Sequence, residues 1–358
     1  MDRRACRPLS HQGVASKIAV SSRPRFSFII PVRNESHRIE ACLQSIRAQR
    51  YPQDLIEIIV PDQASDDDTR ERAARYGASV MRNPAQRAIH SMPAAFEQAN
   101  GDLVVAMAAD NRVDPEYCMR MVAAFEDSRV ALALPYVTCK NPDYALAVRY
   151  INRFTDPFNH FIYGDASNPR DLSRVYTPVK RGDGVSIYRF PPESPPLLAI
   201  AQGAVVRGPF RMHEGYADDV AVVFDLLEAG RLIACVEAPL VDHYTATGLG
   251  DVLRKFRRII AKNFKRSSSL RWRDRYVPDE RIARRRLWPF YAASIIAPVA
   301  VGLFRAVRDR EPLWLYHPVM TFAFAWIAAT EALRNLPDAV DLLLRGRNSI
   351  DGTEVSKD

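Results

Sequence analysis

The chain lacks both glycine-rich phosphate-binding motifs of the familiar nucleotide-binding folds, because neither GxGxxG nor GxxxxGK[ST] occurs in it. This absence excludes the phosphate cradles of dinucleotide dehydrogenases and of P-loop NTPases. The five cysteines are scattered, without a CxxC pair or a Cys/His cluster. They predict buried thiols in a reducing compartment rather than a disulfide framework or a zinc site.

Signals for nucleic-acid binding and for secretion are also missing. The net charge is +8, but no RNP-like aromatic signature, zinc finger or clear recognition helix accompanies it, so nucleic acid is not an expected partner. Residues 1–24 hold four arginines, one lysine and turn formers, without an apolar core long enough for a secretory signal. We expect these residues to form a mobile leader.

What the sequence does have is the composition of a folded globular protein, with 47% hydrophobic and 26% charged residues. Its 358 residues fit one large α/β unit with additions. The positive charge is concentrated in residues 251–286, which contain fourteen Lys or Arg and four Asp or Glu. Because apolar segments follow directly, this basic interfacial segment is expected to meet an anionic membrane surface or a phosphate-bearing substrate.

Short apolar runs alternate with amphipathic segments along the first 125 residues. The runs predict strands at 26–32, 55–60, 78–81 and 103–107. Each is followed by a predicted helix, the first capped by Ser36, the second opened by residues 62–69, and the others at 89–99 and 115–125. This alternation predicts an α/β fold with a doubly wound, mostly parallel sheet and right-handed crossovers.

The regular alternation ends after a predicted strand at 130–135. Residues 140–196 are rich in Asn, Asp, Pro, Gly and aromatics, and they are too long for an ordinary loop, so we expect a functional insertion over the site. A strand at 199–206, a helix at 218–229 and a strand at 232–236 complete a domain that spans residues 25–250.

Acidic and amide side chains follow two of the predicted strands. Asp62 follows the second strand, and Asp110 and Asn111 follow the fourth. Ligands of open α/β sheets bind beyond the carboxyl ends of strands, and these side-chain oxygens suit Mg²⁺ or Mn²⁺ carrying a phosphate. The alternative interpretation is structural, with these side chains capping the helices that follow.

Four segments resemble, in their order and spacing, the family 2 glycosyltransferases of GT-A fold. They are IIPVRNE at 29–35, VPDQASDDDT at 60–69, AADN at 108–111 and GYADDVAVVFDLLEAG at 215–230. The resemblance extends over about residues 26–244 and implies a GT-A-like fold and a nucleoside-diphosphate sugar as donor.

The resemblance also implies where the donor nucleotide lies. It places Pro31, Arg33 and Glu35 around the base and ribose, and Asp62 on the imide N–H of the base. A carboxylate suits that task, because it only accepts hydrogen bonds and the imide only donates.

A metal site is implied at the third of these segments. Asp110 matches the second acid of the family's DXD motif, whereas Ala108 replaces the first acid, and Asn111 or water is expected to supply the missing oxygen. His243 stands where many relatives carry a histidine near the diphosphate, which makes it a candidate metal ligand; the alternative is a structural histidine. The implied cofactor is Mg²⁺ or Mn²⁺.

The catalytic acids are implied by the fourth segment. Asp218 and Asp219 match the family's paired acids below the acceptor, and we assign Asp219 as the general base that takes the proton of the attacking hydroxyl. In-line attack opposite the leaving group predicts inversion of the anomeric centre. The alternative is that the two acids merely stabilise a helix N-terminus.

Further donor contacts are expected before and after these acids. Gln202 and Gly203 lie in the strand before the acceptor helix, and Gly203 is expected to let substrate approach the backbone. Arg254 and Arg257 are expected to meet phosphate, although the QxxRW signature of processive synthases is absent; the alternative is a solvated basic helix face.

Two apolar runs near the C-terminus, 287–304 and 313–330, are each eighteen residues without a formal charge. That length is the lower limit for crossing a bilayer. We expect an apolar, membrane-associated helical hairpin over 287–334, preferably with two transmembrane helices, followed by a tail at 335–358. Three arginines in the connector 305–312 and prolines within the runs favour bent interfacial helices instead, and buried core helices are a further alternative.

Together these features predict an inverting, metal-dependent glycosyltransferase of polysaccharide biosynthesis at the cytoplasmic face of the cell membrane. Its acceptor is expected to be lipid-linked or a glycan. Ala108 also allows a catalytically degenerate homologue that acts as a binding or scaffold subunit. A nucleotidyltransferase, which shares the sheet, is a weaker alternative.

Overall fold

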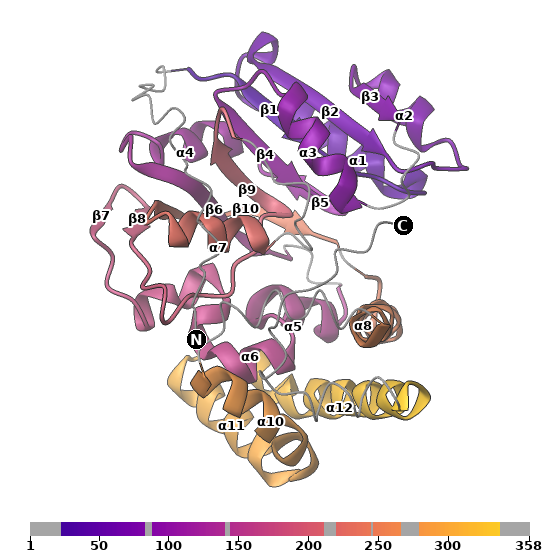
Figure 1. Ribbon diagram of the computed structural model, residues 1–358, viewed down its shortest axis with the longest axis vertical. Helices are drawn as coiled ribbons and strands as arrows, with labels where there is room; N and C mark the ends of the chain where they lie inside the picture. The colour runs from indigo at the N-terminus through magenta and orange to yellow at the C-terminus, as the bar shows by residue number, and fades with distance from the viewer. Residues whose placement is uncertain are drawn as a thin grey trace, which may run out of the picture.

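A computed structural model describes residues 23–82, 88–139, 144–210, 220–244, 246–265 and 279–336. The predicted leader and tail lie almost entirely outside these ranges. The described residues form a ten-stranded sheet with helices on both faces, and a group of C-terminal helices beyond one edge of it (Figure 1).

The first half of the sheet is parallel, as its alternating pattern predicts. Its strands are β1 (Phe26–Ile29), β2 (Ile56–Asp62), β3 (Ser79–Arg82) and β4 (Leu103–Met107). The helices between and after them are α1 (Ser36–Arg47), α2 (Thr69–Arg75), α3 (Ala88–Gln98) and α4 (Tyr117–Ala123), with a short 3-10 turn, η1, at Gln53–Leu55. β1 pairs in parallel with both β2 and β4, so the carboxyl ends of all three strands meet at one edge.

The second half of the sheet is mixed. Its strands are β5 (Asn111–Val113), β6 (Val130–Thr138), β7 (Lys180–Gly182), β8 (Val185–Tyr188), β9 (Gln202–Arg207) and β10 (Leu232–His243). The order is β3-β2-β1-β4-β9-β6-β10-β8-β7, and β5 pairs with the end of β10. β9 runs antiparallel to β4 and β6, an orientation that its apolar pattern does not reveal.

The core has one apolar cluster on each face of the sheet. α1 and α4 cover one face, and α3 and α7 (Ala221–Glu228) cover the other. The helical spacing of α1 correctly predicts its buried residues, which are Ile39, Cys42, Leu43 and Ile46. Ser36 is not the cap, because the helix begins at this residue and Glu35 occupies the N-cap position without a side-chain hydrogen bond.

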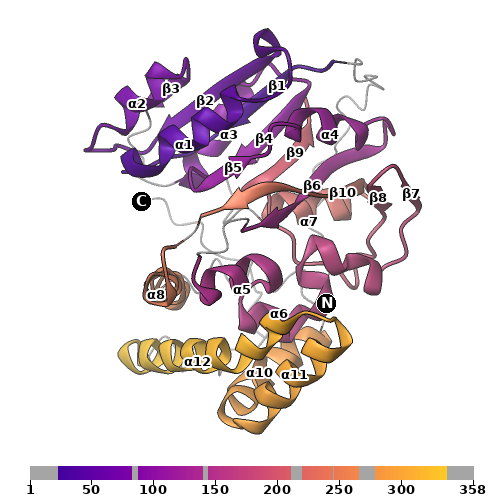
Figure 2. The ribbon, with the colours of Figure 1, turned by 180° about the vertical axis from the view of Figure 1, so that it is seen from behind.

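The segment predicted as an insertion is folded. It contains α5 (Leu146–Phe154), α6 (Pro157–Tyr163), the 3-10 turns η2 (Gly164–Ser167) and η3 (Pro169–Arg174), and the hairpin of β7 and β8. The hairpin extends the sheet, while α5 and α6 lie between the sheet and the C-terminal helices (Figure 2).

The C-terminal region contains α8 (Leu249–Lys265), α10 (Asp279–Ala293), α11 (Ile296–Arg308), the 3-10 turn η4 (Pro312–Tyr316) and α12 (His317–Arg334). The apolar run 287–304 is not one helix: it is divided between α10 and α11, which meet at an angle of 99°. By length and composition, the described residues offer one helix able to cross a membrane, Pro312–Arg334, or two if the bent pair counts as one span.

Candidate functional site

The candidate site lies where β4 ends and meets the end of β10. After β4 the chain turns through Ala108 to Asp110 into β5, whose register with β10 places Asn111 opposite His243. The backbone N–H of Tyr244 donates to the carbonyl of Asp110 at 2.7 Å, which fixes the turn. The capping interpretation is wrong for Asp110 and Asn111, because Asn111 begins β5 and α4 has Glu116 at its N-cap.

Two cationic or protonatable groups face one oxygen of the Asp110 carboxylate. His243 Nε2 and Lys255 Nζ, which comes from α8, each lie 3.4 Å from Asp110 Oδ2. Burial opposes the ionisation of Asp110, but the hydrogen bond and charge of His243 and the charge of Lys255 outweigh it and hold the Asp110 pKa well below its usual range. Asp110 is therefore a stable anion. Its other oxygen, Oδ1, is buried and has no hydrogen-bond partner among the described residues.

The orientation of the His243 ring is set by Asn152, a buried residue of α5 that the sequence analysis did not identify. The Asn152 Nδ2 group donates to the backbone carbonyl of His243 at 2.7 Å, and its Oδ1 atom lies 2.9 Å from His243 Nδ1. Because Asn152 Oδ1 can only accept a hydrogen bond, this geometry places the single N–H proton of a neutral His243 ring on Nδ1. The Nε2 atom then presents either a lone pair or a second proton to Asp110.

These groups could hold a divalent cation together with a substrate phosphate. Asp110 Oδ1 and Asn111 Oδ1 are buried oxygens without hydrogen-bond partners in the described ranges, and His243 Nε2 borders the same carboxylate. A second acid is missing at Ala108, and no cluster of three or more His, Cys, Asp or Glu able to hold a metal occurs in the described part of the chain. The donor set is therefore incomplete by itself, which fits an ion such as Mg²⁺ that takes its other ligands from phosphate and water.

Asp62 lies at the same edge of the sheet, at the end of β2. It is 1% exposed; its Oδ2 accepts from the backbone N–H of Ser65 at 3.2 Å and lies 3.4 Å from Arg70 Nη1. Its Oδ1 is buried without a partner among the residues described. Asp62 does not cap α2, because that helix begins at Thr69 with Asp68 at its N-cap.

The loop after β1 lies between these two carboxylates. Val32 forms a parallel bridge with Asp62, which places Pro31 and the exposed Arg33 beside the end of β2. Burial raises the Glu35 pKa, Arg38 lowers it, and the Asp110 carboxylate raises it further. The Asp110 carboxylate is therefore near enough for its charge to act on Glu35. Asp62 and Asp110 follow β2 and β4, which both pair in parallel with β1, so the two acids lie at the same edge of the sheet.

Gln202 and Gly203 lie at the start of β9. Gln202 Nε2 lies 3.4 Å from His243 Nδ1, within the site. Gly203 does not open the backbone to a substrate as predicted, because it is buried and a Cβ atom there would lie 2.8 Å from Val241 Cγ2. Its φ of +75° explains the glycine instead.

α8 contributes to the candidate site a residue other than the predicted Arg254 and Arg257. Arg254 pairs with Asp251, and Arg257 Nε lies 2.6 Å from Glu331 Oε1 of α12, so neither guanidinium contacts Asp110 in this structure. Lys255, which lies between them in the sequence, reaches Asp110 with its side chain. The predicted catalytic acids Asp218 and Asp219 lie outside the described residues, immediately before Val220 and α7.

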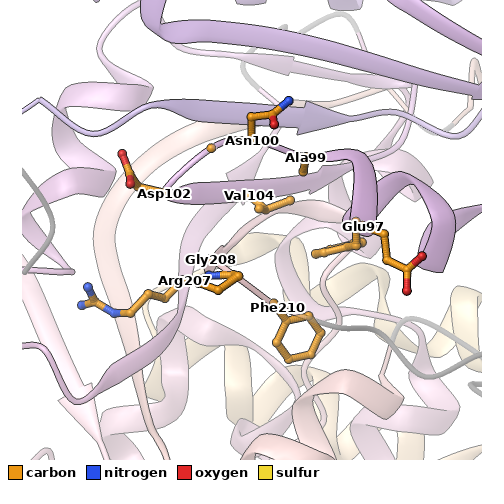
Figure 3. Close-up of a pocket in the computed structure, with 11 residues that line it drawn as sticks. Glu97, Ala99, Asn100, Asp102, Val104, Arg207, Gly208 and Phe210 are labelled. Carbon is orange, nitrogen blue, oxygen red and sulfur yellow. The ribbon is translucent and has the colours of Figure 1, made fainter. Parts of the chain in front are cut away.

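A pocket of about 600 Å³ lies elsewhere, at the opposite end of β4 (Figure 3). Its lining includes Asn100 and Asp102, which precede β4, and Arg207, which ends β9. Because Asp110 follows the other end of β4, this pocket is separate from the candidate site.

The chain is similar to known proteins over part of its length. Residues 27–181 match the family described as Glycosyl transferase family 2. Glycosyltransferase AglE of Haloferax volcanii is 26% identical over 142 residues, which cover 38% of this chain and 47% of that protein. The undecaprenyl-phosphate 4-deoxy-4-formamido-L-arabinose transferase of Pseudomonas savastanoi pv. phaseolicola is 34% identical over 110 residues, which cover 28% and 32%. The chain spans less than half the length of the curated relatives it matches.

Among solved structures, the mannosyltransferase PcManGT of Pyrobaculum calidifontis, in complex with GDP-Man and Mn²⁺, is similar with a TM-score of 0.52. It is 19% identical, and the match covers 88% of both chains. At this level of identity the likeness is one of fold.

Proposed function

We propose that this chain is a family 2 glycosyltransferase that uses a nucleoside-diphosphate sugar, because residues 27–181 match that family and the chain has the GT-A fold. The observation that carries this proposal is the meeting of Asp62, Asp110 and His243 at one edge of the sheet, with buried carboxylate oxygens left without partners among the described residues. Such an edge is where α/β sheets bind nucleotides.

The nucleotide base is proposed to lie against Asp62. The Oδ1 atom of Asp62 has no hydrogen-bond partner among the described residues. An ionised carboxylate can only accept a hydrogen bond, whereas the imide N–H of a base can only donate one. Pro31, Arg33 and Glu35 border the same place and are proposed to contact the base and ribose.

The diphosphate is proposed to lie against Asp110 and His243. Mg²⁺ or Mn²⁺ held there, with Asn111 as a further oxygen donor, would neutralise the charge that develops on the departing diphosphate. Asp110 stays ionised, Asn152 holds His243 with Nε2 toward the site, and Gln202 borders the ring. Mn²⁺ is present with GDP-Man in the similar mannosyltransferase structure, which supports this choice of cofactor.

Proton transfer is proposed to fall to Asp219, with Asp218 beside it. Asp219 takes the proton of the acceptor hydroxyl as that oxygen bonds to the anomeric carbon, and the bond to the diphosphate oxygen breaks with its electron pair. Attack from the face opposite the leaving group inverts the anomeric centre. This step is based on the sequence pattern, because both acids lie outside the described residues.

The acceptor is proposed to be lipid-linked, at the cytoplasmic face of a membrane. A relative is named for undecaprenyl phosphate, which supports an acceptor of this class. Arg254 and Arg257, with their basic neighbours on α8, would favour phosphate-bearing lipid near the site.

A second candidate is a degenerate homologue that binds nucleotide without catalysis. It is favoured by Ala108, which removes one metal donor, and by Lys255, whose ammonium already neutralises Asp110. The two candidates differ in whether metal ions are required.

One experiment separates them. The purified chain is incubated with a panel of GDP- and UDP-sugars and a polyprenyl phosphate, with Mn²⁺ or with EDTA, and release of nucleoside diphosphate is measured. We expect metal-dependent release that falls by about 10²- to 10⁴-fold in Asp219→Asn. Asp183→Asn, in the exposed turn between β7 and β8, is the matched control. Nucleotide binding without any release, equal with and without metal, would establish the degenerate homologue instead.

A further inference from the structure

Exposed apolar side chains are concentrated on the C-terminal helices. Among the residues that the structure describes, eighteen large apolar side chains are exposed, and thirteen of them lie between residues 287 and 336. Those thirteen are Leu287, Phe290, Ile295, Ile296, Val299, Leu303, Phe304, Val307, Leu315, Val319, Trp326, Leu333 and Leu336. A group of exposed apolar residues of this size indicates an interaction surface, whereas apolar residues scattered singly over a surface are ordinary.

α10 and α11 form a bent pair whose apex is apolar. The helices meet at 99° around Ser294 and Ile295, and Ile295 and Ile296 at the apex are 61% and 78% exposed. From Leu287 to Phe304 the pair carries no formal charge. In Figures 1 and 2 the pair lies on the side of α6 that faces away from the sheet. We refer to residues 287–304 as the apolar wedge.

Both ends of the wedge contact the domain of residues 25–250, which is called the catalytic domain on the basis of the proposed function. Before it, Arg281 donates to the Pro195 carbonyl and to Ser194 Oγ, and its guanidinium lies 4.6 Å from the Tyr163 ring centre. After it, Arg305 Nη1 lies 2.7 Å from Asp165 Oδ1. The chain thus enters and leaves the wedge on the same side.

The connector after the wedge is also fixed to the catalytic domain. Arg308 Nη2 lies 3.3 Å from Asp165 Oδ2, and Asp309 Oδ1 lies 3.1 Å from Arg174 Nη1 of η3. A hairpin that crossed a bilayer would carry this connector to the opposite side from Asp165 and Arg174, and these ion pairs could not exist.

α12 is likewise held at both of its ends. At its start, the Trp314 ring stacks on Phe154 of α5 at 3.8 Å, and His317 Nδ1 lies 2.5 Å from the Tyr150 hydroxyl. At its other end, Glu331 pairs with Arg257 of α8 at 2.6 Å. Although α12 is long and apolar enough to cross a membrane, these contacts hold it along α5 and α8.

Positive charge borders the apolar surface on both sides. Arg284, Arg285 and Arg286 precede the wedge, and Arg310 follows it, whereas Arg308 is already paired with Asp165 and Asp309. Cationic side chains beside an inserted apolar segment are attracted to anionic lipid headgroups. The charge distribution therefore favours an anionic bilayer as the occupant of this face.

We propose that the wedge formed by α10 and α11 inserts into one leaflet of an anionic membrane and returns, with α12 lying in the interface. Residues 279–336 then attach the protein to the membrane without crossing it. The attachment would bring the site close to a lipid-linked acceptor, a consequence that rests on the proposed function.

Insertion is tested by sedimentation of the full chain with vesicles of phosphatidylcholine, alone or mixed with phosphatidylglycerol. We expect binding to the anionic vesicles and a loss of about tenfold or more in Ile296→Asp, because the wedge would then bury a charge. Met119→Asp is the matched control, since Met119 is also an exposed apolar residue, 59% exposed, but lies on α4. Binding to neither vesicle, or dimers that Ile296→Asp dissociates in place of vesicle binding, would overturn the proposal.

The topology is tested with Arg310→Cys, labelled on vesicle-bound protein by a membrane-impermeant maleimide and compared with the parent chain. The proposal predicts labelling from the side of the catalytic domain without detergent. Labelling only after detergent would mean that the hairpin crosses the bilayer and would overturn it. His243→Ala distinguishes the two proposals, because it should abolish sugar transfer while leaving vesicle binding unchanged.

Discussion

His243 Nε2 lies 3.4 Å from Asp110 Oδ2, although one residue ends β10 and the other follows β4. A carboxylate oxygen and an imidazole lone pair repel each other at this distance unless a proton or a cation lies between them. Positive charge is therefore needed to stabilise the contact between Asp110 and His243. An imidazolium, the Lys255 ammonium or a divalent metal ion can supply it.

Lys255 should compete with a metal ion for Asp110. Its ammonium lies 3.4 Å from the same Oδ2 atom, so removing the charge in Lys255→Met should tighten Mn²⁺ binding to the nucleotide-free chain several-fold. Lys255→Arg, which keeps the charge, is the matched control. Calorimetric titration measures the affinity, and weaker binding in Lys255→Met than in the control would show that the ammonium does not oppose the metal.

Asn152 should act as a positioning residue for His243. Asn152→Leu keeps a similar volume but removes both hydrogen bonds to His243. Such outer partners of a metal ligand typically contribute 10- to 100-fold in metal affinity, and we expect a loss of about this size. The loss should appear in the electron paramagnetic resonance titration of Mn²⁺ with GDP or UDP present.

The control for this substitution is Asn152→Asp, which keeps an acceptor for His243 Nδ1 and should retain more of the metal affinity than Asn152→Leu. Urea unfolding of both variants separates a folding defect from a local one. Equal metal affinity in Asn152→Leu and the parent chain would rule out the positioning role.

Gly203→Ala should destabilise the fold. The backbone φ of +75° costs an L-residue about 1–2 kcal/mol, and the added Cβ would in addition lie 2.8 Å from Val241 Cγ2. Gly184→Ala is the matched control, because Gly184 has a φ of +74° with nothing within 4 Å of a Cβ atom. Urea unfolding should show the larger loss of unfolding free energy for Gly203→Ala. Equal losses in the two variants would mean that Val241 of β10 moves to accommodate the added methyl group.

Buried His160 should make stability depend on pH. Burial, assisted by the nearby Arg305, lowers the His160 pKa to about 3, whereas an unfolded chain binds the proton below about pH 6.5. The unfolded state therefore binds more protons as the pH falls below 6.5, and the free energy of unfolding should drop by up to about 1.4 kcal/mol per pH unit for this residue.

His160→Phe removes this titration while keeping a ring beside Trp314. Urea unfolding between about pH 7.5 and 5, the range in which histidine is the main titrating side chain, should give a smaller slope for the variant than for the parent chain. The same slope in both would show that His160 is protonated in the folded state.

The sequence predicts the parallel half of the fold well, because local patterns determine it. β4 matches the predicted range, Leu103–Met107, and the buried face of α1 is the one that helical spacing indicates. The direction of β9 could not be predicted, because a short apolar strand reads the same in either direction. The break between α10 and α11 falls at Ser294 and Ile295, rather than at one of the prolines that the sequence offers.

The site is predictable only where a residue follows a strand. Asp62 and Asp110 do so, and the structure brings them to one edge of the sheet. Asn152 and Lys255 reach the site through tertiary packing of α5 and α8, so sequence periodicity could not single them out. Arg257 pairs with Glu331 of α12, a contact that its charge and position in the sequence do not predict.

Asp110 and His243 are proposed to hold a divalent cation for the donor's diphosphate. The most direct measurement is the binding of GDP and UDP to the purified chain, titrated with Mn²⁺ and repeated with Asp110→Asn, which keeps the shape of the side chain and removes its charge. Mn²⁺ is expected to tighten nucleotide binding to the parent chain and not to the variant. Nucleotide binding that is the same with and without Mn²⁺, and the same in both chains, would contradict it.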